Sequence, residues 1–251
     1  MAFYFAGDVH GGNDIKKFNR ANFPSGKNLT KDDYIFICGD FGLVWYEEGS
    51  KLSGYKTQNH WKKWLSEIFP NTKILVTLGN HENYDLVEKL PIIDMFDDKV
   101  RKVNEQIYLF ERGHIYNIEG KKFLSLSGAM SIDKNWRLIQ ESSSTGKLWW
   151  EQELWTTTEE NNCIDIIENN NWKVDYVVSH TAPDTIVNIL FPDILKWSGK
   201  DTDPTARFFD FIYKKPLQFK KWYFGHWHVD RKYENFIACY DKIHKEDVNY
   251  H

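Results

Sequence analysis

The chain has 251 residues, of which 41% are hydrophobic, enough for a substantial core, and we expect a single domain over residues 1–251. A formal net charge of -4 gives no global basic excess, so we expect no broad binding to duplex DNA. Three widely spaced cysteines without CxxC pairing argue against a disulfide framework or a zinc knuckle and predict reduced, buried thiols. Since no signal-like start and no membrane-length apolar run occurs, we expect a cytoplasmic protein that does not bind membranes.

Short apolar runs rich in Ile, Val, Phe and Tyr predict buried strands at residues 2–6, 34–38, 73–78, 121–127, 174–179, 220–224 and 235–239. Helix-like stretches alternate with them at residues 60–69, 149–170 and 203–215. This alternation predicts an α/β fold, and the number of strands suggests two packed sheets with helices outside. The polar, aperiodic stretch 130–146 predicts a long loop over a functional face.

Two tryptophan pairs require an interpretation. Trp61 and Trp64 have near-helical spacing, which favours core packing over a role as a substrate platform. Trp149 and Trp150 could stack on a base, because aromatic faces bind bases without sequence preference, but packing of a helix against the sheets is favoured.

The first predicted strand ends in GDVHGG, residues 7–12. In an extended segment Asp8 and His10 point to the same side and can converge on one metal ion. The flanking glycines allow a sharp turn and the close approach of a ligand. Taken by itself, the stretch favours a polar turn after a strand, in which Asp8 caps a helix and His10 is hydrogen-bonded locally.

Four further predicted strands also end in polar side chains: Asp40 in GDFG, Asn80 and His81 in GNHE, the lone His180, and His226 and His228 in GHWH. Ligands bind beyond the carboxyl ends of strands in open α/β sheets, so we expect these side chains to gather in one crevice. Carboxylate, amide and imidazole donors without thiolate suit first-row divalent ions, and seven ligands are too many for one ion. Two metal ions that share a bridging carboxylate are the economical solution.

Taken in order, the blocks DxH, GD, GNHE, a lone His and GHxH resemble the calcineurin-like metallophosphoesterase superfamily over residues 8–228. The resemblance implies a four-layer αββα sandwich, an α/β (α+β) fold with two mixed β-sheets flanked by helices and a two-metal site between the sheets. One ion would take Asp8, His10, Asp40 and His228. The other would take Asp40, Asn80, His180 and His226, with Asp40 as the bridge.

The resemblance also implies a hydrolase that cleaves a phosphate mono- or diester by in-line attack of a metal-bridging hydroxide, on a small-molecule or nucleotide substrate. The two divalent ions would be Mn, Fe, Zn or Ni, with manganese favoured. His81 would contact the phosphoryl group as general acid or charge stabiliser. Glu82 would orient His81 or a metal ligand. Besides His81, the resemblance assigns Asp40 to catalysis. The sequence does not indicate the oligomeric state.

Other functions stay open. The second block, GDFGLVW, lacks the Asp and Arg of the GDxxDRG block of Ser/Thr protein phosphatases of this superfamily, which disfavours that activity. In SIDKNWR, Lys134 and Arg137 could bind phosphate instead, or they could be solvated charges paired with Glu141 or Asp133. Arg112 is expected to be structural. A nuclease or RNA-end phosphatase and a catalytically silent regulatory binding protein are the remaining alternatives.

Overall fold

The computed structural model describes residues 1–143, 146–198 and 203–248. Part of the expected loop, residues 144–145, therefore lies outside the described residues. The single domain predicted over residues 1–251 also includes residues 199–202 and 249–251, which lie outside the described residues. It therefore stays a prediction.

A first sheet contains seven strands in the described part of the chain, in the order β13-β1-β2-β3-β6-β5-β4. The central strands β1, β2, β3 and β6 are parallel, and β13, β5 and β4 extend the sheet by antiparallel pairing. Their bounds are β1 (Ala2–Ala6), β2 (Tyr34–Cys38), β3 (Lys73–Thr77), β4 (Ile92–Met95), β5 (Asp98–Lys102), β6 (Ile107–Phe110) and β13 (His244–Asp247).

A second sheet has six strands among the described residues, in the order β11-β12-β10-β9-β8-β7. Strands β12, β10, β9 and β8 are parallel, and β11 and β7 pair antiparallel at the two edges. Their bounds are β7 (Ile115–Ile118), β8 (Lys121–Leu126), β9 (Tyr176–Ser179), β10 (Lys221–Phe224), β11 (Arg231–Tyr233) and β12 (Phe236–Ala238).

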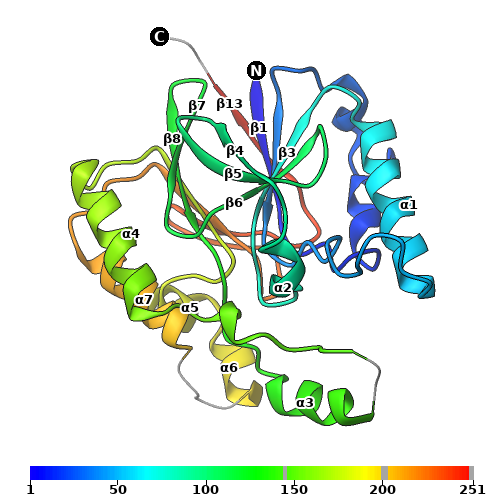
Figure 1. The fold of residues 1–251 in the computed structure, drawn as a ribbon. Coiled ribbons are helices and arrows are strands. Elements are labelled where there is room, and N and C mark those ends of the chain that lie inside the picture. The colour runs from blue at the N-terminus through cyan, green and yellow to red at the C-terminus, as the bar shows by residue number, and fades with distance from the viewer. Residues whose placement is uncertain (144–145, 199–202, 249–251) are drawn as a thin grey trace.

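Helices cover the outer faces of both sheets (Figure 1). Helix α1 (Ser53–Ile68) lies beside the first sheet, and α4 (Thr157–Asn169), α5 (Asp184–Leu190) and α7 (Pro204–Lys214) lie beside the second. The other helical elements are η1 (Ile15–Phe18), η2 (Pro24–Asn28), α2 (Tyr84–Val87), α3 (Lys134–Ser143), η3 (Glu151–Glu153) and α6 (Pro192–Ser198).

The central strands are buried on both faces because their residues alternate between two apolar layers. In β1, Tyr4 joins the layer under α1, whereas Phe3 and Phe5 face the second sheet. Phe5 stacks on Tyr223 of β10 with ring centroids 3.7 Å apart, so aromatic contacts hold the two sheets together. A third apolar layer lies between the second sheet and its helices. The three apolar layers separate four layers of secondary structure, in the order helices, sheet, sheet and helices. This arrangement confirms the predicted four-layer sandwich.

The predicted strands are all present, and β1 and β2 match to the residue. The long loop expected over 130–146 is wrong, because α3 occupies much of it. The residue of α3 that points into the protein is Arg137, which is 3% exposed. Trp136 and Ile139 of the same helix are 60% and 65% exposed. The usual apolar stripe of a surface helix is thus reversed, which hides the helical period.

The helix expected from residue 149 begins only at Thr157. Thr156 and Glu159 form a capping box that sets this start, and a 3-10 turn precedes it. Helix α1 starts earlier than expected, at Ser53.

Two expectations from composition can be compared with the structure. All three cysteines are buried free thiols, as predicted. In the described ranges, no helix has the length and apolar character that crossing a membrane requires.

Candidate metal centre

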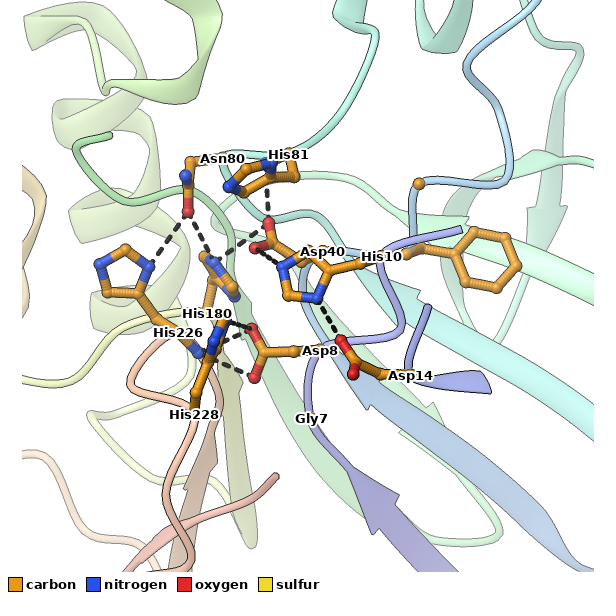
Figure 2. Close-up of polar contacts among 12 residues, drawn as sticks. Gly7, Asp8, His10, Asp14, Asp40, Asn80, His81, His180, His226 and His228 are labelled. Carbon is orange, nitrogen blue, oxygen red and sulfur yellow. Dashed lines mark hydrogen bonds and ion pairs between the residues drawn. The ribbon is translucent and has the colours of Figure 1, made fainter. Parts of the chain in front are cut away.

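The polar residues that follow five strands converge at one edge of the sandwich (Figure 2). Strands β1, β2 and β3 of the first sheet lead to Asp8, Asp40 and Asn80. Strands β9 and β10 of the second sheet lead to His180 and His226. Since each set of strands is parallel, their carboxyl ends meet, and the two sheets bring both sets together.

The first group of side chains is Asp8, His10, Asp40 and His228, whose candidate donor atoms all lie within 4.8 Å of one another. His10 Nε2 lies 3.1 Å from Asp40 Oδ2. His228 Nε2 lies 3.8 Å from Asp8 Oδ1. Two carboxylates and two imidazoles at this spacing form a donor set suited to a divalent cation.

The second group adjoins the first through Asp40. Asn80 Oδ1 lies 2.9 Å from His180 Nε2 and 3.1 Å from His226 Nδ1. His180 Nε2 is in turn 3.2 Å from Asp40 Oδ1. One oxygen of Asp40 therefore faces each group, as a bridging carboxylate requires.

Contacts behind the donors orient them. Asp14 Oδ2 lies 2.6 Å from His10 Nδ1, and the carbonyl oxygen of Cys38 lies 2.9 Å from His180 Nδ1. With Nδ1 as hydrogen-bond donor, each ring directs Nε2 to the centre. Asn80 donates from Nδ2 to Ser131 Oγ at 3.0 Å, which turns its amide oxygen inward.

Five of the seven predicted ligands have a left-handed backbone: φ is 27° at Asp8, 45° at His10, 51° at Asp40, 70° at His226 and 49° at His228. Such conformations cost about 1–3 kcal/mol each for residues other than glycine. Strain concentrated on the ends of separate strands indicates that these turns serve a site rather than stability.

Glycines next to the donors permit the close packing. A Cβ on Gly39 would lie 1.9 Å from His180 Nδ1. A Cβ on Gly79 would lie 2.1 Å from Asp40 Oδ1. The glycines that precede Asp40 and Asn80 in the sequence are therefore required by the neighbouring donor.

The electrostatics of the centre favour bound positive charge. Burial raises the pKa of Asp8 to about 7. Burial would also raise the pKa of Asp40, but the surrounding His180, His81 and His10 hold it well below its usual range. Conversely, although burial favours a neutral ring, Asp40 raises the pKa of His10 to about 9 and that of His180 to about 10. A buried cluster that draws protons to its imidazoles also suits divalent cations.

Residues 1–230 match the sequence model of the family described as calcineurin-like phosphoesterase. The chain belongs to this family. The matched range contains every residue of the two groups, so family membership and the candidate cluster together support a metal-dependent phosphoesterase. No curated protein matches the chain.

In this member of the calcineurin-like phosphoesterase family, Arg137 reaches the centre from α3. Nη1 donates to the backbone oxygen of Asn80 at 3.2 Å, and Nη2 contacts the imidazole of His81. Asp133 pairs with Nε at 2.9 Å. Burial lowers the pKa of His81 to about 4, and the positive charge of Arg137 contributes to this lowering. Arg137 is thus both paired with Asp133, one of the partners expected from the sequence, and directed at the centre.

Other candidates lie apart from the donors. The ammonium of Lys134 lies 3.8 Å from the ring centroid of Trp149. Glu82 accepts from the backbone N–H groups of Phe41 and Gly42 at 2.7 and 3.1 Å, so it holds the turn that carries Asp40. Arg112 donates to the backbone oxygen of Leu154 at 2.7 Å, which confirms a structural role.

Sequence reasoning missed three supporting residues. Asp14 follows His10 by four positions, a spacing that could have suggested the contact. Ser131 orients Asn80, and its hydroxyl donates to Glu153 Oε2 at 2.5 Å. The chain holds no local signal for Glu153, because that residue meets Ser131 only in the folded protein.

A hollow of about 300 Å³ lies over the centre. Its polar wall contains Asp40, Asn80 and His81, and Ile132 and Trp227 are among its apolar residues. It offers a small, partly apolar space directly above the donors.

Proposed function

We propose that the protein is a hydrolase of phosphate mono- or diesters with small-molecule or nucleotide substrates, and that it depends on two divalent cations. The observation that carries the proposal is the position of Asp40, whose two oxygens lie 3.1 Å from His10 Nε2 and 3.2 Å from His180 Nε2. A carboxylate shared by two donor groups is the feature that distinguishes a two-metal centre from a single-ion site.

The two ions would be held by the two groups described above. Asp8, His10 and His228 would complete one site with Asp40, and Asn80, His180 and His226 would complete the other. Bound there, the cations would neutralise charge on the phosphoryl oxygens and supply the nucleophilic water. The mixture of oxygen and imidazole donors fits Mn, Fe, Zn or Ni, and manganese is the ion that we would test first.

His81 and Arg137 would act on the phosphoryl group itself. Since a guanidinium only donates, one ring nitrogen of His81 accepts from Arg137, which leaves an N–H at the other nitrogen. That N–H can donate to a phosphoryl or leaving oxygen, so His81 stabilises charge. Arg137 holds the ring and adds positive charge beside it. In the overall reaction, phosphorus gains the hydroxyl of water, the P–O ester bond breaks, and the alcohol leaves with the proton.

Metal-stripped protein should bind two Mn²⁺ per chain and then hydrolyse p-nitrophenyl phosphate or its bis ester. Asp40→Asn should weaken binding of both ions, because both groups lose a ligand. His81→Ala should keep both ions while kcat falls by about 10²- to 10³-fold, the usual effect of removing one charge-stabilising donor. His114→Ala is the matched control, because His114 is not part of the centre. Its Nδ1 lies 2.9 Å from Asp98 Oδ2 instead.

Loss of metal from His81→Ala would refute the division of roles. Two bound ions without turnover of either ester would favour the silent regulatory protein. Turnover of RNA ends or of nucleic acid alone would favour the nuclease alternative. Substantial activity on phosphoserine peptides would revive the disfavoured protein phosphatase activity, and Lys134 stays a predicted phosphate contact until its substitution is assayed.

A further inference from the structure

A groove of about 460 Å³ opens beside the candidate metal centre. Two residues of the centre, His10 and His81, form part of its lining. His81 also lines the hollow over the donors, so the groove and the hollow adjoin at the side chain that would contact the phosphoryl group. The remainder of the lining comes from residues 11–13, from residues 42, 43, 45 and 46, and from the first half of α1.

The walls of the groove include three aromatic side chains, Trp45, Tyr46 and Trp61. Trp45 packs edge-on against buried Trp150, with centroids 5.2 Å apart. Trp61 packs edge-on against Trp64, with centroids 5.5 Å apart. Trp61 thus contacts the core on one side, as its spacing predicted, but it also lines the groove. The packing behind both indoles holds them in place before a ligand arrives.

Glycines let these rings lie against the backbone. A Cβ on Gly12 would lie 2.3 Å from Trp61 Nε1, so the indole reaches the turn that follows His10. A Cβ on Gly54 would lie 2.2 Å from Tyr46 Cζ. The aromatic walls are therefore fitted directly to the loop of the metal centre and to α1.

Gln58 of α1 holds the segment that carries Trp45 and Tyr46. This side chain is 5% exposed, and its Oε1 accepts from the backbone N–H groups of Trp45 and Tyr46 at 2.6 and 3.0 Å. Its Nε2 donates to the backbone oxygen of Tyr46 at 3.2 Å. The exposed residues Asn13 and Thr57 give the rim hydrogen-bonding groups. The groove thus combines a preorganised aromatic interior with a polar rim.

We propose that this groove binds the nucleobase of a nucleotide substrate whose phosphate lies at the metal centre. The inference rests on the proposed function and names its substrate class. A flat base can cover the indole faces and direct its ring edges to the polar rim, as base-binding sites with aromatic walls do. The volume suits a small ligand. A sugar phosphate without a base leaves the aromatic walls uncovered.

The test separates the groove from the centre by using ligands that carry only one half of the substrate. Adenosine has the base without phosphate, and its dissociation constant can be measured by equilibrium dialysis with or without metal. Trp61→Ala should weaken adenosine binding about tenfold, within the range for loss of one stacking ring. It should lower the ratio of kcat/KM for AMP to that for ribose 5-phosphate by a similar factor. Trp61→Phe keeps an aromatic ring, so it should retain most of the adenosine affinity and most of the ratio of kcat/KM values.

Two further variants guard against misfolding. Thr57→Trp adds bulk from an exposed position of α1, so it should block adenosine without removing any core contact. Trp136→Ala removes an exposed indole on α3 and should bind adenosine like the unsubstituted protein.

The proposal is overturned if adenosine does not bind, or if Trp61→Ala and Thr57→Trp, both folded, bind it as the unsubstituted protein does. An unchanged ratio between AMP and ribose 5-phosphate in an active Trp61→Ala variant would also overturn it. If the loaded protein hydrolyses no phosphate ester, the proposed function fails, whereas adenosine binding still decides what the groove accepts.

Discussion

Substitution of Gly39 tests whether the glycines beside the donors are required by packing or only by backbone conformation. Gly39 has a φ of +90°, and an added Cβ would lie 1.9 Å from Nδ1 and 2.4 Å from Cγ of His180. Gly120 has a φ of +73° with no atom within 4 Å of the added Cβ. Both alanine variants adopt a left-handed conformation at a cost of about 1–2 kcal/mol. Only Gly39→Ala adds a collision.

The collision with His180 should add about 1–3 kcal/mol, the usual penalty for overpacking a filled site. With an m-value of about 3 kcal/mol per M, urea unfolding should place the midpoint of Gly39→Ala about 0.3–1 M below that of Gly120→Ala. Displacement of His180 also breaks its 2.9 Å contact with the Cys38 carbonyl, so Gly39→Ala should lose one bound ion. Equal midpoints and equal metal content in the two variants would refute the reasoning.

Three further predictions follow from single contacts. Asp14→Ala removes the carboxylate that orients His10, so Mn²⁺ affinity should weaken about 10- to 100-fold; calorimetry that finds unchanged affinity would exclude this support. Arg137→Lys keeps the charge but not the fork that contacts His81, so kcat should fall while metal content stays, and a full loss of metal would assign Arg137 to structure instead. Burial raises the pKa of the Cys163 thiol, so only the unfolded thiol ionises above about pH 8.5 and the free energy of unfolding should fall as pH rises. Cys163→Ala should flatten that decline in urea titrations at pH 8 to 10, and an identical slope would disprove the assignment.

Much of the fold was predictable because the central strands are apolar on both faces. Strands β1 and β2 are continuous five-residue apolar runs, and every one of their residues is buried. Among the described residues, the strands that escaped prediction are β4, β5, β7, β11 and β13, at or next to the edges of their sheets, and β6, a buried apolar strand inside the first sheet. Strand β13, HKED, alternates between half-buried and exposed residues, and within the described ranges its one paired strand is β1. Such a strand is specified by its partner rather than by its own composition.

Helices showed the same dependence on local signals. Asp203 caps α7 and Pro204 stands at its first position, so the sequence marks the start of this helix. Helix α3 has no comparable signal, because the residue that it buries is Arg137 and its large apolar residues face outward. Its contacts with His81, the Asn80 backbone oxygen and Asp133 explain why a guanidinium occupies the inward position.

The sequence by itself determined which residues could serve as donors, because each lies in a short motif at the end of an apolar strand. Tertiary structure alone decided which oxygen of Asp40 faces each group and that Arg137 meets His81. Side-chain direction and contact between segments as far apart as residues 10 and 228 depend on how two sheets pack, and no local pattern encodes that arrangement. The packing of α1 against the first sheet and the turn after His10 places Trp61 beside the metal centre and so creates the groove.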